Sequence, residues 1–340
     1  MSLLFIRADG NSTVGSGHIM RCLSIAEALR QKQIDCVFVC ADDAMKTRIE
    51  EKGFSVVCLE TAYCEMDQEL PKLLELIETR KPQGILADSY FVTEQYMQTV
   101  HNKVPLAYMD DLNAFDYPVD LLINYNLFSD TLNYGDSQAK LALGCSYTPL
   151  REEFQKILPR KPFSNIKNIL VSTGGADPLG IGLVLLEYAY RKTEYQWDFV
   201  VGGLSDQREK MSACAKGRSH IHLHQSVQKM SKLMLQCDFA ISASGCTLYE
   251  LCAAGTPTCC YTFADNQALA TEIFAQKGLM YSLGDYRLGA QEFLKKLDRI
   301  LSEADPQTLQ AMSHQMQTVV DGHGAQRAAD EILKIMADQG

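Results

Sequence analysis

The sequence predicts an α/β protein made of two doubly wound domains that face each other across a cleft. Short apolar runs alternate with segments of helical spacing along almost all of the 340 residues. This alternation is typical of a mostly parallel sheet with helices on both faces. A charged stretch with prolines at 151–163 interrupts it, and a second series of the same kind follows. The chain is also longer than about 250–300 residues, the size at which single cores stop growing.

The apolar runs identify the expected strands, and helical spacing fills the gaps between them. In the first half, the expected strands are 3–8, 36–40, 55–59, 84–88, 105–109 and 120–124. The helices expected between them are 17–32, 43–52, 67–80 and 93–102. In the second half, the expected strands are 169–172, 197–201, 239–241 and 257–261, and the expected helices are 267–277, 292–303 and 307–338.

These runs divide the chain into domains. We expect an N-terminal Rossmann-like domain over 1–150, a linker over 151–163, a C-terminal Rossmann-like domain over 164–310 and a closing helical segment over 311–340. Ligands of such folds bind beyond the carboxyl ends of the strands. Polar residues that follow a strand are therefore the candidates for a functional site.

Composition narrows the class of partner. A hydrophobic content of 46% excludes a disordered chain, and a net charge of −10 argues against nucleic acid or an anionic membrane as the main partner. A small polyphosphate ligand remains compatible with this charge, because backbone N–H groups bind such ligands locally. The sequence leaves the oligomeric state open.

The twelve cysteines form no C-x-x-C pair, and the sequence starts without the long apolar core of a signal peptide. No stretch approaches the roughly 20 apolar residues of a membrane span. We therefore expect a cytoplasmic protein without membrane insertion, whose thiols are reduced and mostly buried.

One histidine lies where the first apolar strand turns through glycines into a helix. Gly15 and Gly17 allow a tight turn, and His18 is then expected on the first helical turn. The positive end of the helix dipole disfavours the imidazolium, so the ring is predicted to stay neutral and basic. The sequence favours a general base at this position, and a simple polar cap is the alternative.

Two further strand–loop–helix segments occur in the second half. Gly174 and its neighbours follow one strand, and the small residues at 242–247 lead from another strand into a helix. Exposed N–H groups at such a helix start bind anions, whereas close packing of helix on strand is an equally good explanation. Glu250 lies in the first turns of the second helix. There its carboxylate either binds a ribose diol or is stabilised by the positive end of the helix dipole. The segment 265–267 offers three polar side chains to a sugar, although Asp265 or Asn266 is also expected to cap a helix.

Three histidines alternate at 220, 222 and 224, a spacing that puts them on one side of a strand. No carboxylate or cysteine lies at ligand spacing beside them. We favour a partly exposed strand face over a metal site.

Taken together, these segments resemble the GT-B-type UDP-sugar hydrolases of the pseudaminic acid pathway and the related spore coat polysaccharide proteins. A more distant similarity is to the lipid II-forming N-acetylglucosaminyltransferases. The matching segments span nearly the whole chain in the expected order: Arg7-x-Asp9, Gly15-x-Gly17–His18-x-x-Arg21, Asp88–Ser89–Tyr90, Leu150–Arg151-x-Glu153–Phe154, Gly174–Gly175-x-Asp177–Pro178, 242–251, Asn266–Gln267 and Asp321–Gly322-x-Gly324–Ala325-x-Arg327.

The resemblance implies hydrolysis of a UDP-activated amino sugar, with inversion and without a metal or cofactor. It implies that His18 activates water while Tyr90 and Asn266 hold the sugar, and that Arg7 and Arg21 either reach the substrate or pair with carboxylates. Loop 244–247 would bind the diphosphate, Glu250 the ribose, and the segment containing Val227 and Met230 the uracil. The substrate-binding residues expected on this basis are Arg7, Asp9, Gly17, Arg21, Gly174, Val227, Met230, Ser244, Gly245, Cys246, Thr247, Glu250 and Gln267.

Two other functions remain open. A glycosyltransferase of the same fold would pass the sugar to an acceptor instead of water. A non-enzymatic binder of sugar nucleotides would keep its biological role when His18 is replaced.

Overall fold

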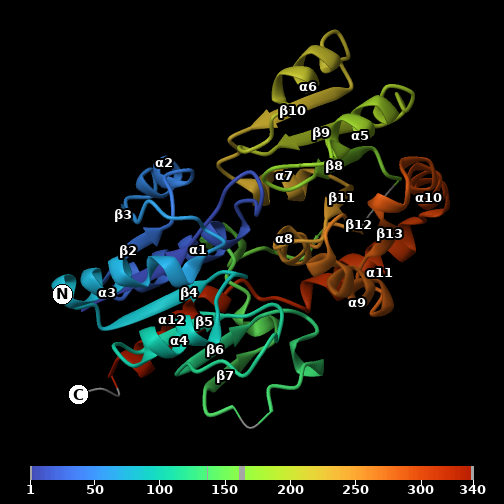
Figure 1. The fold of residues 1–340 in the computed structure, drawn as a ribbon. Helices are drawn as coiled ribbons and strands as arrows, with labels where there is room; N and C mark the ends of the chain where they lie inside the picture. Colours follow the sequence, from blue (N-terminus) through green and yellow to red (C-terminus); the bar gives the residue numbers. More distant parts are fainter. Residues whose placement is uncertain (1, 136, 161–164, 338–340) are drawn as a thin grey trace. The chain divides into compact units, whose positions relative to one another are not determined.

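The computed structural model describes residues 2–135, 137–160 and 165–337. The chain folds into two compact units, each built around its own sheet (Figure 1). Unit 1 comprises Met1–Arg151 and His323–Gly340, and unit 2 comprises Glu152–Gly322. The last segment of the chain therefore belongs to the same unit as the first.

Unit 1 contains a seven-stranded parallel sheet in the order β3-β2-β1-β4-β5-β6-β7. The six strands expected from the first half are all present. The short β7 was not predicted, because its four residues start with an exposed lysine and an exposed leucine. The strands are β1 (Ser2–Ala8), β2 (Ile34–Cys40), β3 (Ser55–Cys58), β4 (Gly84–Asp88), β5 (Leu106–Met109), β6 (Leu121–Asn124) and β7 (Lys140–Leu143).

Helices cover the sheet of unit 1. The central strands β1 and β4 are fully buried apart from the start of β1, as expected for strands covered on both faces. The helix at the end of the described chain packs against α1 and β4. The helical segments are α1 (Gly17–Gln31), α2 (Lys46–Glu50), η1 (Met66–Glu69), α3 (Leu70–Arg80), α4 (Glu94–His101), η2 (Ser129–Thr131), η3 (Cys145–Tyr147) and α12 (Gly324–Ala337).

Unit 2 contains a six-stranded parallel sheet in the order β10-β9-β8-β11-β12-β13. Its strands are β8 (Asn168–Ser172), β9 (Gln196–Val201), β10 (Ile221–Gln225), β11 (Phe239–Ala243), β12 (Thr258–Thr262) and β13 (Tyr281–Asp285). Its helical segments are η4 (Glu152–Phe154), α5 (Ile181–Ala189), α6 (Arg208–Ala215), α7 (Met230–Gln236), α8 (Thr247–Ala254), η5 (Asp265–Gln267), α9 (Ala268–Gln276), η6 (Tyr286–Leu288), α10 (Ala290–Glu303) and α11 (Pro306–Gln317).

The helix expected over 307–338 is in fact two helices, α11 and α12, and two glycines explain the break. Gly322 has a φ of +78°, and a Cβ on it would lie 2.3 Å from the carbonyl oxygen of Phe154. A Cβ on Gly324 would lie 2.2 Å from the carbonyl oxygen of Thr148. The chain therefore needs glycine here to pass close to the backbone of 148–155.

The expected linker over 151–163 is partly ordered against unit 2. Phe154 is buried, and the Arg160 guanidinium donates to the carbonyl oxygens of Met234 and Cys237 near the end of α7. Residues 161–163 of the expected linker lie outside the described residues. All twelve cysteines are free thiols, and no helix in the described ranges is long and apolar enough to cross a membrane.

Candidate active site

His18 lies at the start of α1, where the sequence predicted it. A turn closed by paired backbone hydrogen bonds between Asn11 and Gly15 leads from β1 into the helix, and Gly15 has a φ of +78°. The N-cap residue Ser16 makes no capping side-chain hydrogen bond. His18 is only 7% exposed. The turn therefore places the imidazole on the first helical turn, at the carboxyl end of the sheet.

A buried carboxylate holds the His18 ring. Nδ1 of His18 lies 2.6 Å from Oδ1 of Asp88, the last residue of β4. This contact places the ring hydrogen on Nδ1 and leaves the lone pair on Nε2. Burial alone would raise the pKa of the Asp88 carboxyl, but Arg21 and His18 hold it well below its usual range. Asp88 is therefore an anion that fixes the tautomer of His18.

Arg21 binds the same carboxylate from one helical turn further along α1. Its Nε and Nη2 donate to Asp88 over 2.6 and 2.5 Å. Its Nη1 donates to Asp111 over 2.8 Å and to the Tyr125 hydroxyl over 2.9 Å. The spacing of three residues puts His18 and Arg21 on one face of the helix, which explains why both meet Asp88.

Tyr90 follows β4 and packs edge-on against the His18 ring, with 4.5 Å between ring centroids. Its hydroxyl donates to Oδ2 of Asp111 over 3.0 Å, and Nδ2 of Asn126 donates to Oδ1 of Asp111 over 2.8 Å. Asp111 was not among the residues predicted from the sequence. The available signal was its position two residues after the end of β5, at the same sheet edge as Asp88.

Arg7 and Asp9 form a second buried network beside the first. The Arg7 guanidinium donates twice to Glu69 and once to Asp9, all over 2.6 Å. The Tyr96 hydroxyl also donates to Glu69. Burial raises the pKa of Asp9, against the lowering effects of Arg7 and the Ala41 N–H. The sequence left two alternatives for Arg7 and Arg21, contact with the substrate or pairing with carboxylates. In the structure, both side chains pair with carboxylates.

A small pocket opens beside His18. Its volume is about 210 Å³. Two loop aromatics, Tyr63 and Phe91, pack edge to face at its wall. The lining residues are Asp9, Val14, His18, Tyr63, Asp88, Ser89, Tyr90 and Phe91.

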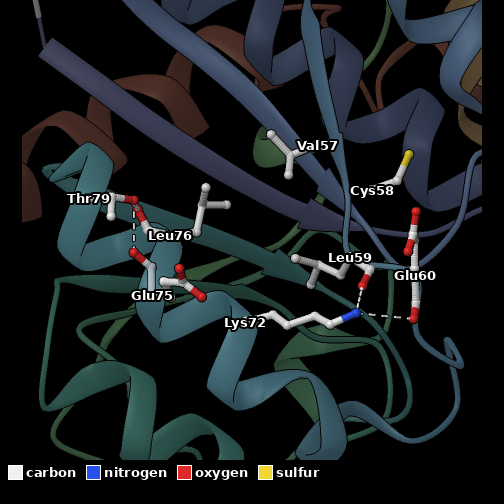
Figure 2. A pocket seen from close by; sticks show the side chains of 8 residues that line it. All are labelled: Val57, Cys58, Leu59, Glu60, Lys72, Glu75, Leu76 and Thr79. Carbon is white, nitrogen blue, oxygen red and sulfur yellow. Dashed lines mark hydrogen bonds between the residues drawn. The ribbon is translucent and has the colours of Figure 1, made fainter.

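A larger open pocket of about 700 Å³ lies elsewhere in unit 1, between β3 and α3 (Figure 2). Figure 2 shows the Lys72 amine reaching the backbone carbonyls of Leu59 and Glu60, from which it is 2.6 and 3.5 Å away. The lining contains none of the predicted site residues. The pocket beside His18 is therefore the one that matches the sequence prediction.

The two strand–loop–helix segments of unit 2 differ at their helix starts. At α5, the buried Asp177 carboxylate accepts the N–H groups of Ile181 and Gly182, both over 2.9 Å. The chain's own carboxylate therefore occupies the position that an anion would take. Gly174 is exposed with a φ of +88°, which turns the chain between β8 and this cap.

The start of α8 is built differently. The N-cap residue Cys246 makes no capping side-chain hydrogen bond, and Gly245 is exposed. Thr247 starts the helix, and Glu250 lies half-buried in its first turn. The Ser244 hydroxyl accepts a hydrogen bond from the Thr271 hydroxyl of α9 over 2.7 Å. This bond links the loop before α8 to another helix of unit 2.

The segment 265–267 forms the short helix η5 before α9. Neither Asp265 nor Asn266 takes the N-cap position of α9, which belongs to Gln267. The Gln267 Oε1 accepts the Phe263 N–H over 3.1 Å, and Asp265 pairs with Arg287 over 2.7 Å. Asn266 is exposed.

The predicted uracil segment follows β10. Val227 is half-buried, and Met230 starts α7 with its N–H donating to the Glu153 carboxylate over 3.2 Å. Glu153, which belongs to one of the matching segments, also accepts from Ser231. Met230 is buried, so its side chain serves the core of unit 2.

The alternating histidines make separate contacts. His220 precedes β10 and contacts the Ala189 carbonyl oxygen, whereas His224 pairs with Asp198 over 2.6 Å. His222 lies near Gln196. In the described parts of the chain, no three His, Cys, Asp or Glu residues are grouped so as to hold a metal ion.

No protein-family model matches the chain. Curated proteins similar to it at low identity include the following three. The uncharacterized protein MJ1062 of Methanocaldococcus jannaschii is 27% identical over 74% of this chain and 54% of its own length, so the chain spans about half of that protein. The spore coat polysaccharide biosynthesis protein SpsG of Bacillus subtilis is 25% identical over 87% of this chain and 88% of its own length. The UDP-2,4-diacetamido-2,4,6-trideoxy-beta-L-altropyranose hydrolase of Campylobacter jejuni is 23% identical over 82% and 97%.

Solved structures match over nearly the whole chain. MurG of Acinetobacter baumannii covers 98% of it with a TM-score of 0.68 at 14% identity. The spinosyn rhamnosyltransferase SpnG, solved with thymidine diphosphate, covers 98% with a TM-score of 0.72 at 13% identity. Together with the two parallel sheets, these matches confirm the predicted α/β fold of the GT-B type.

Proposed function

We propose that this protein hydrolyses a UDP-activated amino sugar, UDP-2,4-diacetamido-2,4,6-trideoxy-β-L-altrose or a close analogue, to UDP and the free sugar. The observation that carries the proposal is the buried His18–Asp88 pair, which lines a small pocket at the carboxyl end of the unit 1 sheet. The reaction belongs to the biosynthesis of a bacterial surface or spore coat glycan.

His18 is the general base of the proposed reaction. With its ring hydrogen donated to Asp88, Nε2 accepts a proton from water as the water oxygen attacks the anomeric carbon. The new C–O bond forms on the face opposite the leaving group, so the configuration inverts. The bond between the anomeric carbon and the phosphate oxygen breaks, and UDP leaves with the electron pair. Asp88 stabilises the imidazolium that forms.

The start of α8 is the proposed diphosphate site. A helix N-terminus favours an anion by about 0.3–1 kcal/mol when exposed and up to about 2 kcal/mol when partly buried. Each backbone N–H donated to a charged oxygen adds about 1.5–3 kcal/mol. These interactions stabilise the charge that develops on the leaving UDP, which is the other requirement of the reaction. Glu250, on the first turn, is the proposed ribose ligand.

The proposal assigns substrate contacts to three further residues. Tyr90 and Asn266 hold the sugar, and the backbone of Val227 faces the uracil. The relative named as a UDP-sugar hydrolase supports this assignment, since the similarity extends over 97% of that protein. We propose that the reaction runs without a metal.

The test is to incubate the purified protein with the candidate UDP-sugar in the presence of EDTA, without an acceptor, and to follow UDP release by NMR. We expect hydrolysis with the inverted anomer formed first. His18→Ala should reduce turnover by about 10²–10⁴-fold, the usual contribution of a general base, and leave UDP binding intact.

His314→Ala is the matched control, because this histidine is exposed on α11. Full activity of the His18 variant would exclude the proposed base. Turnover that begins only when a sugar acceptor is added would instead establish a glycosyltransferase. UDP-sugar binding without turnover under either condition would identify a binding protein.

A further inference from the structure

Five side chains at the carboxyl end of the unit 1 sheet form a closed ring. His18 contacts Asp88, Asp88 contacts Arg21, and Arg21 contacts Asp111. Asp111 then accepts from Tyr90, whose ring packs back against His18. Because every member touches two others, the ring fixes their positions jointly. His18, Asp88 and Tyr90 line the pocket, whereas Arg21 and Asp111 lie behind them and complete the ring.

We propose that Asp111 is a positioning residue of this site, and that it makes the Tyr90 hydroxyl a hydrogen-bond acceptor toward the sugar. The inference rests on the proposed function, since it concerns the sugar end of the same substrate. It adds a residue that the matching sequence segments do not contain, and it assigns a direction to the hydrogen bond that Tyr90 makes.

The direction follows from the chemistry of a carboxylate. An ionised Asp only accepts hydrogen bonds, so the Tyr90 hydroxyl hydrogen is directed to Asp111. An oxygen that gives its one hydrogen to Asp111 can meet a substrate only as an acceptor. A sugar hydroxyl or amide N–H satisfies this requirement, whereas an ether oxygen or a carbonyl oxygen does not. The site thus selects a sugar that presents a donor at this point.

Three donors converge on Asp111, and this explains why an amide would not replace it. Arg21 and Tyr90 donate to Oδ2, and Asn126 donates to Oδ1. In Asp111→Asn, one of these oxygens becomes an NH₂ group that faces a donor. If the NH₂ group faces Tyr90, the hydroxyl becomes the acceptor of that contact and its hydrogen turns elsewhere. If it faces Asn126, the loss of charge still weakens the contact with Arg21.

The test is a double-mutant cycle on kcat/KM for hydrolysis, with Tyr90→Phe, Asp111→Asn and the double variant. We expect each single change to lower kcat/KM about tenfold, which corresponds to one hydrogen bond of ordinary strength. The double variant should be no worse than Asp111→Asn alone, because both changes remove the same interaction. Multiplicative losses would overturn the inference, as would a single Asp111→Asn variant with wild-type kcat/KM.

Two additions keep the test decisive. Asp111→Glu retains the negative charge beside Arg21 but moves the carboxylate by one methylene group, so this variant replaces Asp111→Asn if the latter does not fold. We expect the kcat of Asp111→Glu to fall while its unfolding temperature stays near that of the wild type. Asp130→Asn is the matched control, since Asp130 is exposed in the same unit. Wild-type kcat in Asp111→Glu would contradict a positioning role.

The ring can also be examined when no substrate is turned over, which separates this inference from the proposed function. The Nδ1–H proton of His18 is a specific NMR signal, because that hydrogen lies in a short contact with Asp88. We expect Asp111→Asn to shift this resonance through Arg21, and Asp130→Asn to leave it in place. An unshifted resonance in Asp111→Asn would show that Asp111 does not act on the ring, whatever the substrate.

Discussion

The buried pair between Arg7 and Glu69 gives the sharpest prediction about the stability of unit 1. Both side chains have an exposure of 0%, and Glu69 accepts the Nε and Nη2 hydrogens of Arg7 as well as the Tyr96 hydroxyl. The perturbation is Glu69→Ala. It leaves two donor positions of a buried cation and one buried hydroxyl without their acceptor.

The magnitude follows from this loss. Removing one partner of a buried ion pair costs about 3–5 kcal/mol, because the remaining charge stays buried. Asp9 still accepts from Nη1 of Arg7 over 2.6 Å, so the cation keeps one anionic partner. We therefore expect the lower part of that range, about 3–4 kcal/mol. For a domain of this size, this loss lowers the unfolding temperature by roughly 6–16 °C.

The assay must report on unit 1 alone, because two compact units need not unfold together. Hydrogen exchange measured by mass spectrometry on peptides from β1 and β4 gives the opening free energy of the unit 1 core. The single tryptophan of the chain, Trp197, is buried in unit 2, so its fluorescence monitors the other unit in the same samples. Exchange protection in unit 1 should fall in Glu69→Ala.

A triple replacement separates charge from packing. Arg7→Met with Asp9→Asn and Glu69→Leu removes all three charges of the network and keeps the side-chain volume, and we expect it to be more stable than Glu69→Ala. If the triple variant is the less stable of the two, the cost does not come from an uncompensated cation. A loss below about 1 kcal/mol in Glu69→Ala would equally refute the reasoning, because exposed pairs contribute that little.

Two other predictions concern unit 1. The folded state lowers the pKa of Asp88, so this carboxyl contributes stability that is present above its ordinary pKa of about 4 and is lost as the pH falls toward the folded value. The difference in unfolding free energy between wild type and Asp88→Asn should therefore shrink as the pH falls below about 4. Urea unfolding at each pH measures it, and a difference that stays the same between about pH 4 and about pH 3 would contradict it. Gly324→Ala should destabilise unit 1 strongly, since its Cβ would lie 2.2 Å from the Thr148 carbonyl oxygen, whereas Gly203→Ala should be neutral because nothing lies within 4 Å of that Cβ. Thermal unfolding of the two variants compares them directly, and equal unfolding temperatures would count against the close packing.

The fold was predictable because its signals are local. Each apolar run of four to six residues is a strand covered by helices, and such runs stand out from the polar helix faces between them. β7 escaped because its start, Lys140 and Leu141, is exposed at the sheet edge. The break between α11 and α12 escaped for a different reason. Helical spacing continues through 318–323, and only the tertiary contact of Gly322 with the Phe154 backbone interrupts it.

The site was predictable in its centre and not in its surroundings. His18 and Arg21 lie one helical turn apart, so sequence spacing alone places them on one face. Their carboxylate partners come from other strands: Asp88 ends β4, Asp111 follows β5, and Glu69 lies in η1. Contacts between residues that are 62 to 90 positions apart leave no periodic trace in a single sequence. Asp111 therefore became visible only when the strand order was known.

The two loops of unit 2 show why a glycine-rich loop alone does not identify an anion site. Both follow a strand and precede a helix, but Asp177 accepts the first N–H groups of α5, whereas the N-cap residue of α8, Cys246, makes no capping side-chain hydrogen bond. Placing a carboxylate at α8 should therefore reproduce the closed state of α5. Gly245 is suited to this change, because a Cβ there would meet nothing within 4 Å and its φ is not positive. Gly245→Asp should fold normally and bind UDP at least tenfold more weakly, measured by calorimetry, since it adds like charge where the diphosphate is proposed to bind.

The control must carry the same charge at another helix start of the same unit. Gln291→Asp does so on the exposed first turn of α10, where a carboxylate is favourable and no ligand is proposed. If net charge alone weakened UDP binding, both variants would lose affinity equally. If Gly245→Asp bound UDP as tightly as wild type, the diphosphate would have to bind elsewhere. Only a loss confined to Gly245→Asp agrees with a nucleotide held at α8.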